Sequence, residues 1–269
     1  MKAAHAAGSL MRSNLHSNKK VRAVTLHDIK LELDVRCQRV IEGFLRKAVP
    51  EASILGEEGT AGNSHTEYRW VVDPIDGTVN FAYGIPHACV AIALQVKNGN
   101  LGTLRKLKLY QKRYLSHFSG HNDYVTLLGV VYDPFLDEMW TAISGEPARL
   151  NDRVIHVSTR RNIADAIVST GFAKSRAALE RALPYFNRLA RLGRKIRIMG
   201  AAALGLTYVA TGRFDAYVER DIRLWDIAAG GLIVECAGGE FWYEPTSAKY
   251  TYRMIATNGL LRAQLPKLN

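Results

Sequence analysis

The stretch WVVDPIDGTVNF at residues 70–81 decides which fold the sequence predicts. Its apolar start indicates a buried strand that runs into Asp73, and Pro74, Asp76 and Gly77 directly afterwards indicate a tight turn. Two carboxylates three residues apart at the end of a buried strand repel each other, and an unpaired buried charge is costly. We therefore expect a ligand to lie between Asp73 and Asp76.

The rest of the chain has the composition of a folded protein. It has 269 residues, 48% of them hydrophobic, which is enough for one large domain or two closely joined lobes. No apolar run approaches the roughly 18 to 20 residues of a membrane span, and the initial MKAAHAAGSLM has the pattern of an amphipathic helix rather than a signal peptide. The three cysteines lie far apart without a CxxC pair, which argues against a disulfide framework or zinc site. We expect a cytoplasmic protein without a membrane segment.

Positive charge is the one unusual feature of the composition. The formal net charge is +11, and Lys and Arg are concentrated in LRKLKLYQKRY at residues 104–114. Such charge attracts nucleic acid or a phosphorylated substrate, but an ordinary solvated surface is also basic in many proteins. Residues 100–124 form a long polar connection between two expected strands. We expect a surface insertion without a direct catalytic role. The alternative is a contact to the substrate or to a partner such as nucleic acid or an acidic protein.

Apolar spacing along the chain predicts a layered α/β fold. Helical spacing is found at residues 3–15, 33–49, 176–192, 201–211 and 224–237. Strand patterns are found at residues 52–56, 68–73, 87–96, 126–133, 138–143, 166–170, 195–199, 214–219, 240–243 and 254–258. Strands that alternate with helices predict sheets whose faces are covered by helices. We expect an N-terminal lobe over residues 1–150 and a C-terminal lobe over residues 151–269, with a soft boundary near residues 145–160.

Several acidic residues stand where a strand ends or a helix begins. These residues are Glu57, Glu58, Asp73, Asp76 and Asp226. Ligand sites of α/β proteins gather at such positions. Converging carboxylates need a hard cation, and oxygen ligands without His or Cys favour Mg²⁺ or Mn²⁺ over zinc. Because Mg²⁺ is usually shared with phosphate oxygens, the cluster also predicts a phosphorylated substrate.

The dipeptide after Asp76 is suited to hold that phosphate. Gly77 permits close approach of a ligand to the backbone, and a helix that starts here presents free N–H groups to an anion. The hydroxyl of Thr78 can hold or activate a water molecule. Metal ligands, a phosphate cradle and a water-positioning group are therefore expected within about a dozen residues.

The motifs GEEG, WVVDPIDGTVNF and WDIAAGGLIVECAGG, in this order, strongly resemble the inositol monophosphatase family of Mg²⁺-dependent, lithium-sensitive phosphatases. The resemblance covers nearly the whole chain. It implies an αβαβα sandwich and a homodimer. It also implies that a metal-activated water hydrolyses the phosphate ester of a small polyol, with inositol monophosphate as the leading candidate substrate. The substrates of related phosphatases remain alternatives, namely 3′-phosphoadenosine nucleotides, fructose 1,6-bisphosphate and histidinol phosphate.

The resemblance also implies roles for individual residues. Two or three Mg²⁺ ions, for which Mn²⁺ can substitute, would be held by Glu57, Asp73, the Ile75 carbonyl, Asp76 and Asp226. Phosphate and substrate would be bound by Gly77, Thr78, Ala202, Glu219 and Asp226. Thr78, Asp34 and Glu57 would be catalytic, with Thr78 and Asp34 orienting the attacking water. The sequence departs from the family at Gln38, where Glu is frequent, and in HDIKLELD before Asp34.

Overall fold

The computed structural model describes residues 1–269 except 26–28, 64–65, 98–123, 173–175 and 269. An eight-stranded sheet occupies the N-terminal part of the chain, in the order β10-β9-β8-β7-β6-β5-β3-β4. Its strands are β3 (Ser53–Gly56), β4 (Gly59–Ala61), β5 (Tyr68–Asp76), β6 (Cys89–Lys97), β7 (Tyr124–Asp133), β8 (Glu138–Ile143), β9 (Arg149–Leu150) and β10 (Arg153–Val154). The predicted basic segment at residues 104–114 lies outside the described residues.

A five-stranded sheet occupies the C-terminal part, in the order β12-β11-β13-β15-β14. Its strands are β11 (Ile167–Thr170), β12 (Lys195–Arg197), β13 (Ala216–Arg223), β14 (Glu240–Pro245) and β15 (Thr251–Thr257). A separate hairpin pairs β1 (Val21–Val24) with β2 (Ile29–Leu31). Short helical turns are α3 (Thr78–Ala82), η1 (Ile163–Asp165) and η2 (Arg262–Gln264).

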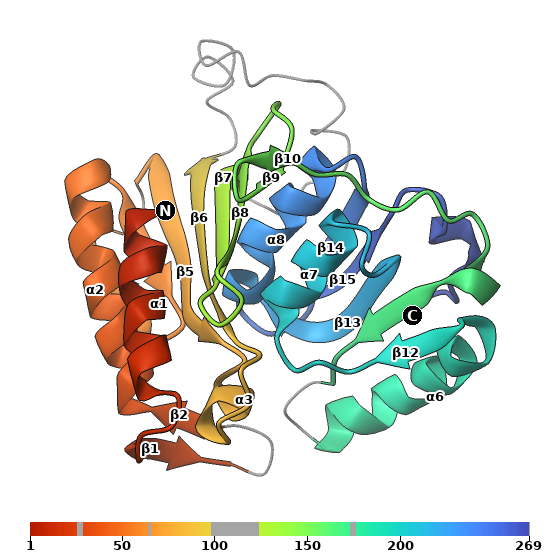
Figure 1. The fold of residues 1–269 in the computed structure, drawn as a ribbon, viewed down its shortest axis with the longest axis horizontal. Helices are drawn as coiled ribbons and strands as arrows, with labels where there is room; N and C mark the ends of the chain where they lie inside the picture. Colours follow the sequence, from red (N-terminus) through yellow and green to blue (C-terminus); the bar gives the residue numbers. More distant parts are fainter. Residues whose placement is uncertain (26–28, 64–65, 98–123, 173–175, 269) are drawn as a thin grey trace.

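Helices cover both sheets and fill the space between them, as Figure 1 shows. The outer face of the eight-stranded sheet is covered by α1 (Lys2–Asn14) and α2 (Glu32–Ala48). Between the sheets lie α7 (Ala202–Ala210) and α8 (Leu224–Cys236), and α6 (Arg176–Leu192) packs outside the second sheet. The predicted αβαβα sandwich is confirmed.

Apart from Asp226 in its first turn and Glu235 in its last, helix α8 is apolar around its circumference because it is packed between two sheets. Residues with small side chains let its neighbours come close to it. A Cβ atom placed on Gly231 would lie 2.2 Å from Cε1 of Phe241 in β14, so no larger residue fits there without movement. The small residues of the AAGG part of WDIAAGG are thus needed for close packing. This packing keeps α8 close to its neighbours, with its first turn at the end of the eight-stranded sheet.

Strand β6 is buried on both faces, as its apolar sequence predicts. It nevertheless pairs antiparallel with both neighbours, β5 and β7. Helices cover both faces of this sheet, which explains why an antiparallel strand lacks the usual alternation of apolar and polar residues.

The three cysteines, Cys37, Cys89 and Cys236, are free and buried. Among the described residues, no helix is both long enough and apolar enough to cross a membrane.

Glu235, in the last turn of α8, has a carboxylate that the fold disfavours. Burial raises its pKa to about 8, whereas the pKa of a glutamate in an unfolded chain is about 4.3. At a pH above about 4.3, the folded state therefore binds more protons than the unfolded state. As a result, the free energy of unfolding falls as the pH rises from about 4.3 to 8. A carboxylate is also unfavourable at the negative end of a helix dipole.

We expect Glu235→Gln to raise the free energy of unfolding at pH 8 by about 1–2 kcal/mol and at pH 4 by almost nothing. Urea unfolding at both pH values measures this difference. Glu180→Gln is the matched control, because the Glu180 side chain is 64% exposed. Equal stabilities of the Glu235→Gln variant and the wild type at pH 8 would contradict the assigned cost.

Candidate active site

Asp73 and Asp76 reach the same space because strand β5 contains a bulge. Asp73 pairs with Ala91 of β6 and Asp76 pairs with Cys89, so three steps along β5 match two steps along β6. In a regular strand, residues three apart point to opposite faces. A bulge changes this alternation and re-aims a side chain, a device that is common beside active sites. Pro74 lies within the bulge, where a missing backbone N–H does least harm to the pairing.

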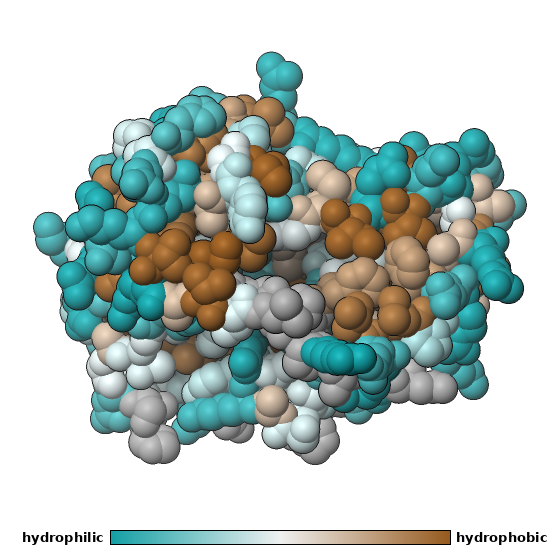
Figure 2. Space-filling model, turned by 90° about the horizontal axis from the view of Figure 1, so that it is seen from below, coloured by the Kyte–Doolittle hydropathy of each residue, from teal (hydrophilic) through white to brown (hydrophobic). Residues whose placement is uncertain are grey.

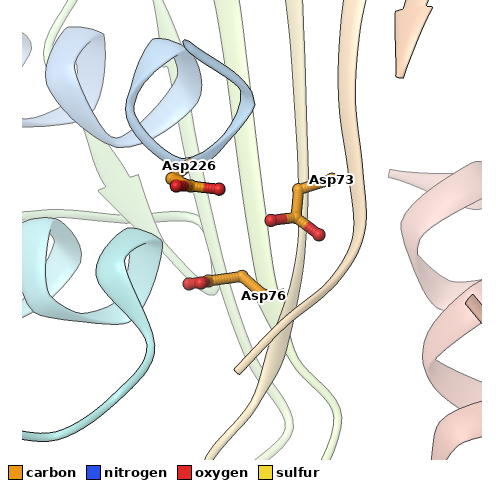
Figure 3. A group of neighbouring side chains, drawn as sticks. All are labelled: Asp73, Asp76 and Asp226. Atoms are coloured by element: carbon orange, nitrogen blue, oxygen red, sulfur yellow. The ribbon is translucent and has the colours of Figure 1, made fainter. Parts of the chain in front are cut away.

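The third carboxylate comes from the first turn of α8. The backbone N–H of Arg223 donates to Oδ2 of Asp226 at 3.1 Å, which fixes the side chain at the helix N-terminus. Asp73, Asp76 and Asp226 each offer an oxygen within 4.8 Å of the others. Figure 3 shows the three side chains converging from strand and helix. Two segments separated by about 150 residues of sequence thus form one acidic centre.

The three carboxylates are not equally stabilised. Asp73 is 1% exposed, and burial together with the negative charges of Glu57, Asp76 and Asp226 raises its pKa well above the usual value. Burial also raises the pKa of Asp76, but the N–H groups of Ala202 and Ala203 donate to its two oxygens at 3.1 and 2.7 Å and oppose the rise. The centre as a whole therefore favours a positive ligand.

Gly77, the residue after Asp76, has a backbone that other residues adopt poorly. Its φ is +91°, in the left-handed region. A Cβ atom here would lie 2.9 Å from the carbonyl oxygen of His87 and 3.1 Å from Cβ of Ala201. The side-chain amide of Asn80, three residues on, donates to the carbonyl oxygens of His87 and Met199 at 2.9 and 2.8 Å. The close packing at Gly77 and the hydrogen bonds of Asn80 position the Gly77–Thr78 backbone beside the carboxylates.

Thr78 and Asp34 are brought into contact, as the family resemblance implies. Thr78 Oγ1 lies 3.3 Å from Oδ1 of Asp34 and 2.9 Å from the carbonyl oxygen of Ile75. Asp34 lies in the first turn of α2, and the N–H of Leu31 donates to its Oδ2 at 2.9 Å. Burial, followed by the charges of Glu57 and Glu58, raises the pKa of Asp34 to about 7. Asp34 can therefore exchange a proton near neutral pH.

The centre lies in a cavity of about 300 Å³. Figure 2 shows the molecule from below, where apolar residues lie on both sides of a hollow. Every residue given a site role from sequence lines the cavity except Asp34, which reaches it through Thr78. Glu58, which was counted with the clustered acidic residues, does not line the cavity. The lining predicted residues are Glu57, Asp73, Ile75, Asp76, Gly77, Thr78, Ala202, Glu219 and Asp226.

Residues that the sequence did not indicate complete the cavity. Tyr217 donates its hydroxyl to the Glu219 carboxylate, and Phe172 and Ile198 add apolar surface. Behind the cavity, the buried Cys89 donates its thiol to Oδ2 of Asp76 at 3.6 Å. Of these residues, only Tyr217 could have been expected from the sequence. It lies two residues before the candidate Glu219, and residues two apart on a strand share a face.

Known proteins share both the sequence pattern and this fold. The model of the inositol monophosphatase family matches residues 1–104 and 121–262. "Nus factor SuhB" of Pasteurella multocida is 34% identical over 243 residues, which cover 89% of this chain and 81% of that protein. "Inositol monophosphatase 2" of Solanum lycopersicum is 32% identical over 273 residues, which cover 97% and 93%.

A solved structure gives the same assignment. The extragenic suppressor protein suhB from Bartonella henselae superimposes with a TM-score of 0.81 at 31% identity, over 98% of this chain and 94% of that one. The family model spans most of the chain and a relative above 30% identity spans nearly all of it. The chain therefore belongs to the inositol monophosphatase family and is a phosphoric monoester hydrolase.

Proposed function

We propose that the protein is a Mg²⁺-dependent enzyme that hydrolyses the phosphate ester of a small polyol to the free alcohol and phosphate. The leading candidate substrate is inositol monophosphate. The observation that carries the proposal is the set of three carboxylates within 4.8 Å, of which Asp73 and Asp76 are buried and Asp226 is half-buried, beside the left-handed turn at Gly77. The name of the Solanum relative supports inositol monophosphate as the substrate. The family resemblance supports a homodimer. The scattered cysteines without a CxxC pair support a cytoplasmic location, and the change in the strand and helix pattern near residues 145–160 supports two lobes, residues 1–150 and 151–269.

The chemistry of the donor atoms fits Mg²⁺. Among the described lining residues, the side chains at the centre offer carboxylate oxygens and neither His nor Cys, which is the ligand set of a hard cation. Glu57, Asp73, Asp76, Asp226 and the carbonyl of Ile75 would hold two or three Mg²⁺ ions, or Mn²⁺ in their place. Bound ions would neutralise the charge that develops on the phosphoryl and leaving oxygens.

The chain itself supplies positioning and a proton acceptor. The N–H groups of Gly77 and Thr78 would orient the phosphate for attack along one line. As water attacks phosphorus, its proton passes to Thr78 Oγ1 and the Thr78 proton passes to Asp34, whose raised pKa suits it to accept. The leaving alcohol oxygen then takes a proton from solvent.

The alcohol end of the substrate would lie near Glu219 and Ala202. The Tyr217 hydroxyl donates to the Glu219 carboxylate and holds it in the cavity, where it can accept a hydrogen bond from a substrate hydroxyl. Ala202 at the start of α7 leaves room for a sugar-sized ring. A site built to accept a hydroxyl proton discriminates strongly against analogues that lack the hydroxyl.

A substrate panel tests the proposal and orders the alternatives. We expect Mg²⁺-dependent phosphate release from inositol 1-phosphate with kcat/KM at least about tenfold above 3′-phosphoadenosine 5′-phosphate, fructose 1,6-bisphosphate and histidinol phosphate. Millimolar lithium is expected to inhibit the reaction, as the family resemblance implies. A preference for one of the other three substrates would reassign the alcohol, and release that persists in EDTA would contradict the metal requirement.

A further inference from the structure

Glu58, the residue after Glu57, is a buried carboxylate whose cationic partners both come from the β1–β2 hairpin. Its side chain is 5% exposed and lies 3.3 Å from Nη1 of Arg22 in β1 and 3.4 Å from Nζ of Lys30 in β2. The Arg22 and Lys30 side chains are 51% and 42% exposed, but the carboxylate is buried, so loss of both partners would leave it with an uncompensated charge. These two ion pairs therefore tie the hairpin to the turn that carries Glu57.

Strand β1 makes few apolar contacts, whereas β2 is anchored in the core by Leu31 and by Ile29, which packs against it. All four residues of β1 are exposed, including Val21 and Val24 at 51% and 66%. The last residue of β2, Leu31, is buried, and its N–H is the donor to Oδ2 of Asp34. The hairpin thus touches the active site twice, at Glu58 through charge and at Asp34 through a backbone hydrogen bond.

Gln38 joins these two contacts from α2. Its Oε1 accepts the backbone N–H of Glu58 at 3.0 Å, and its Nε2 donates to the carbonyl oxygen of Gly59 at 3.2 Å. Gln38 lies one turn after Asp34, so α2 and the Glu57–Glu58 turn are held at a fixed distance. It also fills the space beside Gly56, where a Cβ atom would lie 2.3 Å from its Oε1.

We propose that Glu58 is a positioning residue: its ion pairs with Arg22 and Lys30 clamp the β1–β2 hairpin and thereby fix Glu57 and Asp34. The inference rests on the proposed function, since Glu57 is assigned there as a metal ligand and Asp34 as the proton acceptor. Loss of the clamp leaves the turn held by Gln38 and the hairpin held by Leu31, so both become more mobile, and this weakens metal binding without removing any ligand.

Direct electrostatics is the competing explanation, and it predicts a different sign. Glu58→Gln removes a negative charge near the centre, so it weakens Mg²⁺ binding under either explanation. The double variant Arg22→Gln/Lys30→Gln removes two positive charges. Electrostatics alone then predicts tighter binding of Mg²⁺, whereas the clamp predicts weaker binding because the same ion pairs are lost.

Calorimetric titration of the purified protein with Mg²⁺ measures this sign. We expect the Kd to rise about tenfold in Glu58→Gln and in the double variant, the range found for outer partners of metal ligands. The loss of affinity in the triple variant is expected to be smaller than the sum of the losses in Glu58→Gln and the double variant, because the same ion pairs are broken only once. Hydrogen exchange at the Leu31 amide is expected to quicken in all three. Glu180→Gln, which breaks the exposed pair with Arg176, is the control.

Tighter or unchanged Mg²⁺ binding in the double variant would overturn the proposal. If the wild type binds no Mg²⁺ at all, the proposed function is wrong. The clamp is then tested only by hydrogen exchange at the Leu31 amide. In that case faster exchange in Glu58→Gln and in the double variant supports the clamp, and an unchanged rate overturns it.

Discussion

Asp73→Asn should abolish Mg²⁺-dependent phosphate release, with kcat reduced about 10³-fold or more. Asp73 is the most deeply buried of the three clustered carboxylates, and its pKa is raised by burial and by the charges of Glu57, Asp76 and Asp226. An amide of the same shape removes the negative charge that a shared cation requires. Phosphate release from inositol 1-phosphate at saturating Mg²⁺ measures the loss.

Stability separates this effect from misfolding. Because an amide is easier to bury than a carboxylate surrounded by like charges, the metal-free Asp73→Asn variant should be at least as stable as the wild type. Asp152→Asn is the control: Asp152 is exposed in a turn at φ +65°, a conformation that Asn also tolerates. Retained activity in Asp73→Asn, or a marked loss in Asp152→Asn, would be incompatible with the assigned centre.

Thr78→Ala and Asp34→Asn should each lower kcat by about 10²–10³-fold while Mg²⁺ binding remains close to normal. The two side chains are 3.3 Å apart and form the proposed path for the proton of the attacking water. Deprotonation of Asp34 creates the acceptor, so kcat/KM should rise with pH until Asp34 is ionised. Its pKa is about 7 without a cation, and a bound cation moves the rise to lower pH.

The pH profile and a conservative variant give this prediction its sharpest controls. Thr78→Ser keeps the hydroxyl and should recover activity to within about tenfold of wild type. The rise of kcat/KM with pH should disappear in Asp34→Asn. A profile in Asp34→Asn that matches the wild type would show that another group accepts the proton.

Much of the fold could be predicted because local patterns agree with tertiary packing. The helices over residues 33–49 and 176–192 were expected from apolar spacing, and the structure has α2 at Glu32–Ala48 and α6 at Arg176–Leu192. The β1–β2 hairpin was not expected. Its first strand has no buried face, so no alternation marks it in the sequence.

The site shows where sequence reasoning stops. The spacing of Asp73 and Asp76 indicated a charged turn, but only the bulge explains how residues three apart face one space. The N–H groups of Ala202 and Ala203 stabilise Asp76 from a helix more than 120 residues away. Likewise, Glu58 was counted among the carboxylates of the site, whereas its charge is paired with Arg22 and Lys30. Such partners depend on tertiary contacts that no local pattern encodes.

Anomalous scattering from crystals soaked in Mn²⁺ tests the central assignment most directly. The account predicts a strong peak among the carboxylate oxygens of Asp73, Asp76 and Asp226, with Glu57 at its edge. The same peak should be absent from Asp73→Asn crystals. A Mn²⁺ peak only elsewhere in the molecule, or none at saturating Mn²⁺, would contradict the claim that these carboxylates form the metal centre of the phosphatase.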